Sequence, residues 1–571
     1  MSGCLLLIIA VVYFTAFYFI YGKFISRVLG VDPSRPTPAH TRNDGVDYTP
    51  ARPAVLFGHH FASIAGSGPI LGPIFASELG WGPAILWILL GSVFFGGLHD
   101  FAALFLSVRH EGKSISSVIE ELIGYAGRML FSIFCWTTLV LVVAMFALMT
   151  AEIFIATPSA ATASLIFILL APVYGFFVNK GILSVLTASL IFVPLTFLTV
   201  YVGMLLPCDL TAIGSYFGLE LSHGACSIIW LAVLGVYVFI ASVTPVQWLL
   251  QPRDFLNSFL LYAMLVIGFF GIVLYNPHIA QDAFHGLVVH LPSGADKSVF
   301  PTLFIVIACG ACSGFHSLVA SGTTSKQVSS EKDIQLVGYG GMLLEGVLGV
   351  ISLISVIYLS GSDFTAAVAK PQLAFASGIA TFSSALGFSA EVAGPFISLV
   401  LAAFMMTSLD TATRLGRFIW QEILLGRSDR RQSGPQTLPA ARRFLSNSYV
   451  ASVIIVLVAV LLCVSGKAGA IWPVFGASNQ LLAALTLLGI SLFLLKYRSR
   501  SYIAFIPMIF MTVMSCWGLG MMMTSSSTAL MLVVICAVLL LLTALLMTLA
   551  VKSVLKIRKA RRISGLKPSE Q

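Results

Sequence analysis

The sequence predicts an all-α polytopic membrane protein with about 15 transmembrane helices. Of the 571 residues, 58% are hydrophobic and only 10% are charged, whereas about 25% charged residues is typical of soluble domains. The chain also contains many apolar runs of about 20 residues, the length that a helix needs to cross the hydrocarbon core of a bilayer. Repeated runs of this length favour helical spans over a β-barrel.

The distribution of Lys and Arg predicts how these spans are oriented. With the spans assigned as below, 29 of the 32 Lys and Arg residues fall on one side. Only Lys297, Lys370 and Lys467 fall on the other side. Because cytoplasmic loops are enriched in Lys and Arg, we expect the N-terminus outside and the C-terminus in the cytoplasm. These charges also meet anionic membrane lipid, so the net charge of +9 does not indicate a nucleic-acid partner.

The chain divides into five parts. We expect residues 1–54 to form an N-terminal anchor helix and a basic cytoplasmic loop, and residues 55–412 to form a ten-helix core. A cytoplasmic basic loop (413–446), accessory C-terminal helices (447–551) and a basic cytoplasmic tail (552–571) follow. As a hypothesis, the core consists of two inverted halves, 55–205 and 225–412. The predicted spans are residues 3–22, 55–80, 83–107, 129–155, 161–178, 184–205, 225–249, 257–275, 300–320, 336–360, 390–412, 447–465, 472–494, 502–520 and 529–551.

The first core span, residues 55–80, has a helix-breaking centre, Gly66-Ser67-Gly68-Pro69. Gly lacks a Cβ and Pro lacks an N–H, so the helix is expected to unwind there. Unwound backbone survives in a membrane only inside protein or along a wet cavity, and transporters bind substrate at such breaks. A kinked, well-packed helix is the alternative. Residues 225–249 are the expected positional counterpart. The expected substrate-binding residues are Gly66, Ser67, Gly68, Pro69, Thr244 and Pro245.

Most ionisable residues inside the core spans lie at a similar depth, toward the cytoplasmic side, on five spans. Intramembrane ionisable residues mark functional sites by default, and His titrates near neutral pH, which suits a proton relay. The candidates for proton coupling are His59, His60, His99, Asp100, His316, Glu345 and Asp410. For each one the alternative is a buried polar group satisfied by a neighbour. Asp410 has such a neighbour in Arg414, four residues on and on the same helical face.

Two other kinds of ion site are alternatives. A Na⁺ site would combine backbone oxygens of the unwound span with hydroxyls, for which Ser313, Ser317 and Ser321 are the candidates. The His and Asp residues suit Zn²⁺, but no closely spaced ligand motif such as HExxH occurs. We therefore expect no metal and no cofactor.

Two further motifs favour structural roles. Cys309-Gly-Ala-Cys312 has the spacing of a redox motif, but it lies in an apolar run, where small residues make close helix contacts. Asn479 and Gln480 lie in a C-terminal span and are expected to form hydrogen bonds between helices.

Seven stretches of the chain resemble the carbon starvation protein A (CstA) family of bacterial inner-membrane transporters. In chain order they are GHHFASIAGSGPILGP, HDFAALFLSVRHEGKS, ASVTPVQWLLQPRDF, FIVIACGACSGFHSLVASGTTSK, VGYGGMLLEG, TSLDTATRLGRF and IWPVFGASNQLLA. The resemblance implies starvation-induced uptake of peptides, or pyruvate–proton symport as in some members. It also implies a LeuT-like core of 5+5 inverted repeats with accessory helices, because the family is grouped with the amino acid–polyamine–organocation transporters.

The predicted function is therefore secondary active transport in the bacterial inner membrane: proton-coupled uptake of small carboxylate-bearing nutrients, peptides or pyruvate. Na⁺-coupled transport by the same fold is the first alternative. A metal-dependent membrane enzyme, a sensor and a channel are the others. We expect no enzymatic activity.

Overall fold

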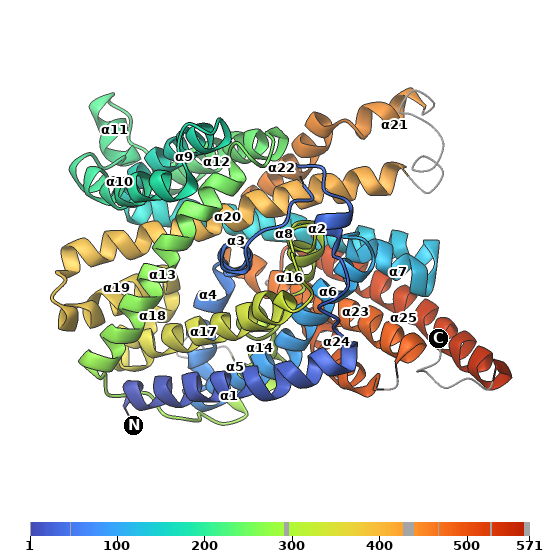
Figure 1. The fold of residues 1–571 in the computed structure, drawn as a ribbon. Coiled ribbons are helices and arrows are strands. Elements are labelled where there is room, and N and C mark those ends of the chain that lie inside the picture. Colours follow the sequence, from blue (N-terminus) through green and yellow to red (C-terminus); the bar gives the residue numbers. More distant parts are fainter. Residues whose placement is uncertain are drawn as a thin grey trace.

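The computed structural model describes residues 2–45, 47–290, 296–425, 439–465, 468–498, 500–525 and 528–564. Helices account for almost all of the regular structure there. In that part of the chain the strands are β1 (Val288–His290) and β2 (Asp296–Ser298), which form an antiparallel pair with Val289 opposite Lys297. The two chain ends lie at opposite ends of the helix bundle (Figure 1).

Twelve helices within the described residues are long and apolar enough to cross a membrane. Two of them contain a π-helical segment, η2 (Gly91–Gly96) between α5 and α6, and η4 (Gln335–Gly340) before α17. The twelve are α1 (Gly3–Leu29), α5–α6 (Trp81–Leu90 and Gly97–Arg109), α8 (Tyr125–Ala156), α9 (Pro158–Asn179), α10 (Val185–Leu205), α12 (His223–Val243), α13 (Leu250–Tyr275), α17 (Gly341–Ile357), α20 (Ala390–Leu425), α23 (Ala468–Tyr497), α24 (Tyr502–Thr524) and α25 (Leu530–Ser564).

The other three predicted spans are not long continuous helices, so the expected count of 15 is not reached. Residues 55–80 form α3 (Pro53–Ile64) and α4 (Gly68–Ala76). Residues 300–320 form α14 (Val299–Val306), α15 (Ala308–Ala311) and α16 (Gly314–Gly322). The third, α22 (Ser448–Ser465), is apolar but short.

Shorter elements connect the long helices. The segment 361–388, expected at the membrane interface or re-entering the membrane, contains two short helices, and the second of them packs against α13, α17 and α20. The short elements are α2 (Pro38–Thr41), η1 (Ser77–Leu79), α7 (Ile115–Ile123), α11 (Leu210–Tyr216), η3 (Thr324–Lys326), α18 (Gly361–Ala369), α19 (Pro371–Ser383), η5 (Ser384–Leu386) and α21 (Ala440–Leu445).

Local chemistry explains several helix ends. The Ser2 hydroxyl accepts a hydrogen bond from the Leu5 N–H at 3.2 Å and caps α1, which ends at Gly30 with φ of 72°. Asp209 caps α11 through its side chain in the same way. After α1 the chain returns across the bundle, and the Ala51 N–H donates to the Gln327 carbonyl at 3.0 Å. The loop after α1 therefore lies against the end of α16 and η3.

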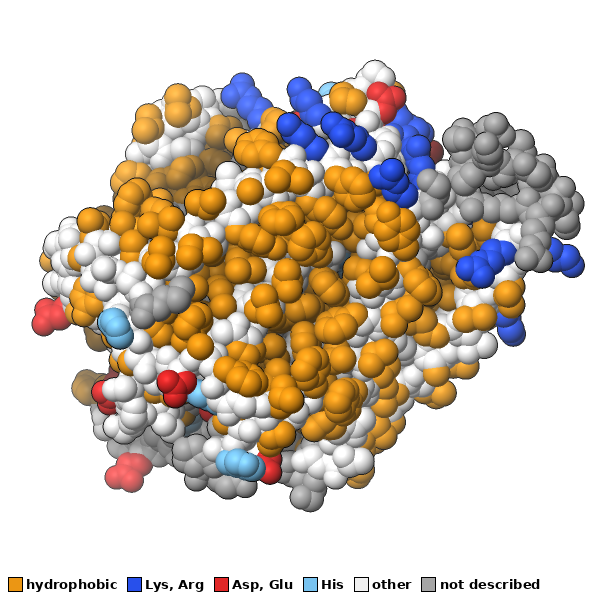
Figure 2. All heavy atoms as spheres, turned by 90° about the horizontal axis from the view of Figure 1, so that it is seen from below, with side chains coloured by type: hydrophobic (Ala, Val, Ile, Leu, Met, Phe, Trp, Pro, Cys, Tyr) orange, Lys and Arg blue, Asp and Glu red, His pale blue; other side chains and the backbone are white. Residues whose placement is uncertain are grey.

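The longest helices form the centre of the fold. Helices α8, α20 and α23 are mostly buried, and α8 packs against both of the others. Helices α1, α10 and α25 lie at the periphery and expose large apolar side chains, such as Leu186 at 71%. Figure 2 shows a broad apolar face, with most of the visible Lys and Arg along its upper and right-hand edge. An apolar belt with basic residues at one edge is the surface of a multi-pass membrane protein.

Candidate functional site

The first broken span unwinds at Ala65, Gly66 and Ser67. Helix α3 ends at Ile64, and α4 starts at Gly68 with Pro69 in its first turn, where the missing N–H of Pro costs nothing. The break thus lies slightly earlier than Gly66–Pro69. The Ser67 hydroxyl is buried and has no hydrogen-bond partner among the described residues.

The second broken span is α14–α16, which corrects the expectation that residues 225–249 are the counterpart of the first. Helix α12 runs unbroken to Val243, and Thr244 and Pro245 lie in the turn that follows it. The chain breaks instead at Ile307 and again at Cys312 and Ser313. Thr244 and Pro245 therefore lie at a helix end rather than at an internal break.

Asn479 of α23 holds the second break in place. Its carbonyl oxygen accepts a hydrogen bond from the Phe315 N–H at 2.9 Å, and its amide donates to the Ser313 hydroxyl at 2.9 Å. The amide thereby caps the start of α16, where N–H groups lack helical partners. Asn479 thus bonds between helices, as expected, whereas the buried Gln480 amide has no partner among the described residues.

The two breaks pack directly against each other through small residues. A β-carbon at Gly68 would overlap the side chain of Cys309, and one at Gly72 would lie 2.6 Å from the Val306 carbonyl oxygen. Gly310 approaches Pro69 in the same way. The CxxC stretch therefore makes a close helix contact, as its apolar setting predicts.

A chain of acidic and histidine side chains lies beside the breaks. Asp100 on α6 accepts from His99 Nδ1 and from His316 Nδ1, both at 2.7 Å. The other ring nitrogen of His316, Nε2, lies 3.3 Å from a carboxylate oxygen of Glu345 on α17. All four side chains are at most 1% exposed. We call these four residues the α16 cluster, because His316 of α16 joins its two carboxylates.

The α16 cluster offers two positions for one proton, His316 and Glu345. A net charge buried in a low-dielectric interior is expensive unless it is paired and hydrogen-bonded. A protonated His316 donates to Asp100 and places its charge 3.3 Å from a Glu345 oxygen, so one proton here neutralises part of the charge of the two carboxylates. Moving that proton onto Glu345 leaves a neutral imidazole and a neutral acid. The two arrangements carry the same net charge and differ only in which residue holds the proton.

His60 lies at the edge of the α16 cluster. Its Nδ1 is 2.9 Å from the Thr324 hydroxyl, and its Nε2 has no partner among the described residues. The ring lies against Gly341, one helical turn before Glu345, since Cδ2 is 3.5 Å from the position of a β-carbon there. Thr324 was not expected at the site, and only its position after α16 in the sequence hints at it.

His59 and Asp410 belong to a second group, which we call the α13 cluster: His59, Tyr237, Arg253, Asp254 and Asp410. His59 Nδ1 lies 3.5 Å from Asp254, and the Arg253 guanidinium contacts Asp254 and bonds to Asp410. The Tyr237 hydroxyl also donates to Asp410, at 2.7 Å. The expected pairing of Asp410 with Arg414 is wrong, because Arg414 donates to the carbonyls of Ala241 and Thr244.

Arg253 and Asp254 were not expected at the site, because both fall in a loop between two of the predicted spans. Helix α13 begins at Leu250, seven residues earlier than expected, so both lie near its start and are 1% exposed. A charged pair just after a Pro and before a long apolar run is the signal that was available.

The hydroxyls proposed as Na⁺ ligands already have protein partners. Ser317 donates to the Gly314 carbonyl at 2.8 Å, and Ser321 donates to the Ser317 carbonyl at 2.7 Å. Ser313 accepts from Asn479. Over the described residues, no group of three or more His, Cys, Asp or Glu side chains is arranged to hold a metal ion.

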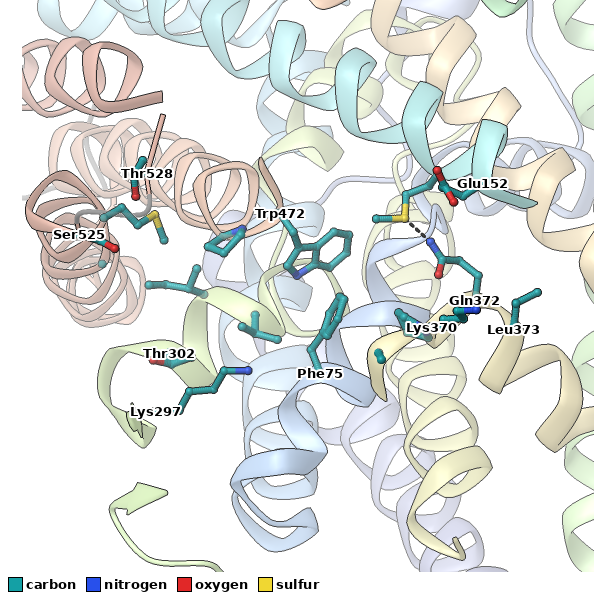
Figure 3. Close-up of a pocket in the computed structure, with 18 of the residues that line it drawn as sticks. Phe75, Glu152, Lys297, Thr302, Lys370, Gln372, Leu373, Trp472, Ser525 and Thr528 are labelled. Carbon is teal, nitrogen blue, oxygen red and sulfur yellow. Dashed lines mark hydrogen bonds between the residues drawn. The ribbon is translucent and has the colours of Figure 1, made fainter. Parts of the chain in front are cut away.

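Two cavities lie at opposite ends of the α3–α4 pair. The small cavity, of about 50 Å³, is lined by His59 and Asp254 together with Asp47, Lys326 and Arg414. The large cavity, of about 860 Å³, is lined by Phe75 of α4 and by Trp472, Glu152, Lys297, Lys370 and Gln372 (Figure 3).

An aromatic ladder runs from the lining of the large cavity to the first break. Its ring centroids are 5.5 Å apart for Phe75 and Trp472, 5.5 Å for Trp472 and Phe475, and 5.9 Å for Phe475 and Phe146. Phe146 in turn lies against Gly66, with its Cζ 3.1 Å from the position of a β-carbon there. The four rings therefore form a continuous packed row between the cavity lining and the break.

Comparison with known proteins gives the family. The family model for carbon starvation protein CstA matches residues 2–373 and 362–518. The chain is 33% identical to a peptide transporter CstA of Helicobacter pylori, covering 84% of this chain and 76% of that protein. It is 31% identical to the Bacillus subtilis peptide transporter CstA, covering 87% and 86%. It is 29% identical to the pyruvate/proton symporter BtsT of Escherichia coli, covering 89% and 80%.

Two solved structures also overlap with most of the chain, at 12% identity. A manganese transporter of Eremococcus coleocola has a TM-score of 0.47 and covers 90% of this chain and 99% of its own. MhsT in complex with L-phenylalanine has a TM-score of 0.48 and covers 88% and 99%. These scores are too low for a conclusion about the fold. The family model and the sequence identities are sufficient, and the chain belongs to the carbon starvation protein CstA family.

Proposed function

We propose that this chain is a proton-coupled secondary transporter that takes up a small carboxylate-bearing nutrient, a peptide or pyruvate, by alternating access. The observation that carries the proposal is the α16 cluster. Two carboxylates and a histidine, all buried, contact one another directly beside two unwound segments. Titratable groups adjoining a break in a membrane helix link protonation to the conformation of that break.

The substrate binds at the first break. The N-terminus of α4 presents the Gly68 N–H and a positive dipole end, which suit a carboxylate, while the Ile70 and Leu71 N–H groups donate to the Ser67 carbonyl. The Ser67 hydroxyl and the Ser408 hydroxyl of α20 are both buried without partners among the described residues. Ser408 lies 2.9 Å from the position of a β-carbon at Gly66. The two hydroxyls are therefore available to a ligand in the break.

The proton leaves through His60, His59 and Asp254 toward the small cavity. The basic residues around this cavity, Lys326 and Arg414, lie on the side that the excess of Lys and Arg identifies as cytoplasmic. The large cavity is then on the outer side, closed from the break by the aromatic ladder. Rearrangement of the ladder opens the break outward, and rearrangement around His59 opens it inward.

The proposal also includes the number of spans, their orientation and an internal repeat. Counting α3–α4, α14–α16 and α22 with the twelve long helices gives 15 spans, with the N-terminus outside the bacterial inner membrane and the C-terminus in the cytoplasm. An internal repeat is supported by a shared pattern: each broken span is followed by a helix with a π-helical segment and then a buried acid, Asp100 or Glu345. The second half of a 5+5 core then starts near Val299 rather than near residue 225.

The names of the relatives support transport and both substrate classes: peptide transporter in two cases and pyruvate/proton symporter in the third. The test is uptake of labelled pyruvate and trialanine into proteoliposomes. An inward proton gradient, with no Na⁺ present, is expected to drive accumulation above equilibrium. Accumulation that a Na⁺ gradient drives at equal pH on both sides contradicts proton coupling and favours the Na⁺ alternative.

A further inference from the structure

The proposed proton-coupling mechanism gives no role to the size of the large cavity or to the charged side chains that line it. Its volume of about 860 Å³ is in the upper part of the range of roughly 300–1,000 Å³ that is usual for sites of drug-sized ligands. A three-carbon acid would fill only a small part of it. Figure 3 shows charged side chains on both sides of the Phe75 and Trp472 rings, with Glu152 and Lys370, next to the neutral Gln372, on one side and Lys297 on the other.

Two lysines line the large cavity, although Lys and Arg are rare on the side of the membrane where the cavity lies. Their presence there points to a role in binding an anion. Only Lys297, Lys370 and Lys467 fall on the sparsely charged side, and Lys467 lies outside the described residues. The other two both line the large cavity. Lys297 is paired with Glu78 at 2.5 Å. The Lys370 ammonium has no ion-pair partner among the described residues and is available to an anion.

Glu152 provides the opposite charge in the same cavity. It lies at the end of α8, its carboxylate is 3.3 Å from His223 Nε2, and its side chain is 38% exposed. No Lys or Arg among the described residues is paired with it. One cavity therefore contains an available ammonium group and a carboxylate whose described partner is a single histidine.

We propose that the large cavity is an outer binding site for a short zwitterionic peptide, whose carboxylate pairs with Lys370 and whose terminal ammonium pairs with Glu152. The site is separate from the break at Gly66, since the aromatic ladder lies between them. The inference rests on the proposed function in one respect, that the ligand is then passed to the break. A monocarboxylate such as pyruvate has no ammonium group, so it gains nothing from Glu152.

The experiment measures dissociation constants of the purified full-length protein in detergent by calorimetry. The ligands are trialanine, N-acetyl-trialanine, trialanine amide and pyruvate. The variants are Lys370→Gln, Glu152→Gln and, as control, Asp363→Asn, which removes an exposed charge on α18 outside the cavity. Each variant is used only if its melting temperature matches that of the wild type.

Removing one charge is expected to weaken binding of only the ligands that carry the opposite charge. Glu152→Gln is expected to raise the dissociation constants of trialanine and trialanine amide about three- to tenfold, as the loss of a charge-assisted hydrogen bond predicts. The dissociation constants of N-acetyl-trialanine and pyruvate stay unchanged. Lys370→Gln is expected to raise the dissociation constants of trialanine and N-acetyl-trialanine by a similar factor and to leave that of trialanine amide unchanged. Asp363→Asn changes nothing.

The proposal is overturned if wild-type protein does not bind trialanine, or if either variant affects all ligands equally. The proposed function is tested apart from it by proton-driven uptake in proteoliposomes. Proton-driven uptake with no charge-selective loss of binding means that the transport proposal stands and the outer site is wrong. Charge-selective loss of binding without proton-driven uptake means that the outer site stands and the transport proposal is wrong.

Discussion

His59 and His60 are neighbours in the chain, yet the imidazole of His59 lies in the α13 cluster and that of His60 lies at the edge of the α16 cluster. His59 Nδ1 faces Asp254 at 3.5 Å, and His60 Nδ1 faces the Thr324 hydroxyl at 2.9 Å. Successive side chains on a helix point about 100° apart, so one turn of α3 reaches both clusters. Helix α3 is the element directly before the first break, and its position thus connects the α13 cluster, the α16 cluster and the unwound backbone.

Glu345→Gln is expected to separate proton coupling from substrate binding. Gln has nearly the same shape and keeps a polar contact near His316, but it does not release a proton. Accumulation driven by a proton gradient should fall at least tenfold, whereas exchange of labelled for unlabelled substrate at equal pH on both sides should remain within about twofold. Both are measured in proteoliposomes, with the exposed Glu391→Gln as control. Unchanged gradient-driven accumulation would remove Glu345 from the coupling mechanism.

Gly68→Ala tests the contact between the two breaks. The added β-carbon would overlap Cys309, and overpacking of this kind costs about 1–3 kcal/mol. We expect a lower melting temperature and slower uptake. The double variant Gly68→Ala/Cys309→Gly removes the obstructing side chain and should recover much of both.

The matched control is Gly520→Ala on α24, where a β-carbon meets no atom within 4 Å. Equal losses for Gly68→Ala and Gly520→Ala, or no recovery in the double variant, would show that the breaks do not depend on this close approach.

Much of the fold follows from hydropathy, and part of the site follows from depth. Apolar length identified the long helices, and Gly66 to Pro69 identified the first break within two residues. Depth along the spans grouped Asp100, His316 and Glu345, which contact one another in the structure.

The other site residues could not be assigned from depth along the span. Their assignment also requires the direction in which each side chain points. His59 and Asp410 share the depth of the α16 cluster but lie in the α13 cluster, because they face a different side of the bundle. Arg253 and Asp254 were hidden for another reason. Hydropathy averages over a window, so two charges before an apolar run are assigned to a loop even when the helix begins before them. The second break is similar, since Gly310 and Cys312 are themselves compatible with a continuous apolar helix.

The pairing of Arg253 with Asp410 is expected to make Asp410→Leu strongly destabilising. Both side chains are at most 1% exposed, and removing one partner of a buried pair costs about 3–5 kcal/mol because the other charge stays buried. The double variant Arg253→Met/Asp410→Leu removes both charges of this pair but also the contact of Arg253 with Asp254, so it should lose less stability than the two single variants together. Melting temperatures in detergent measure this. If the double variant loses as much as the two single variants together, the two residues do not interact.

Replacing His59 and His60 one at a time should produce two different defects. His60 lies at the edge of the α16 cluster, so His60→Gln is expected to reduce both proton-driven accumulation and substrate exchange. His59 lines the small cavity, so His59→Gln is expected to slow release of the proton to the interior while exchange persists. The distinguishing measurement is net uptake as the internal pH is raised from 6 to 8 at constant external pH. Wild-type uptake should rise over this range, because a higher internal pH favours proton release, and His59→Gln uptake should rise less. The same response in both variants would mean that the two histidines act at one site, despite their separate partners.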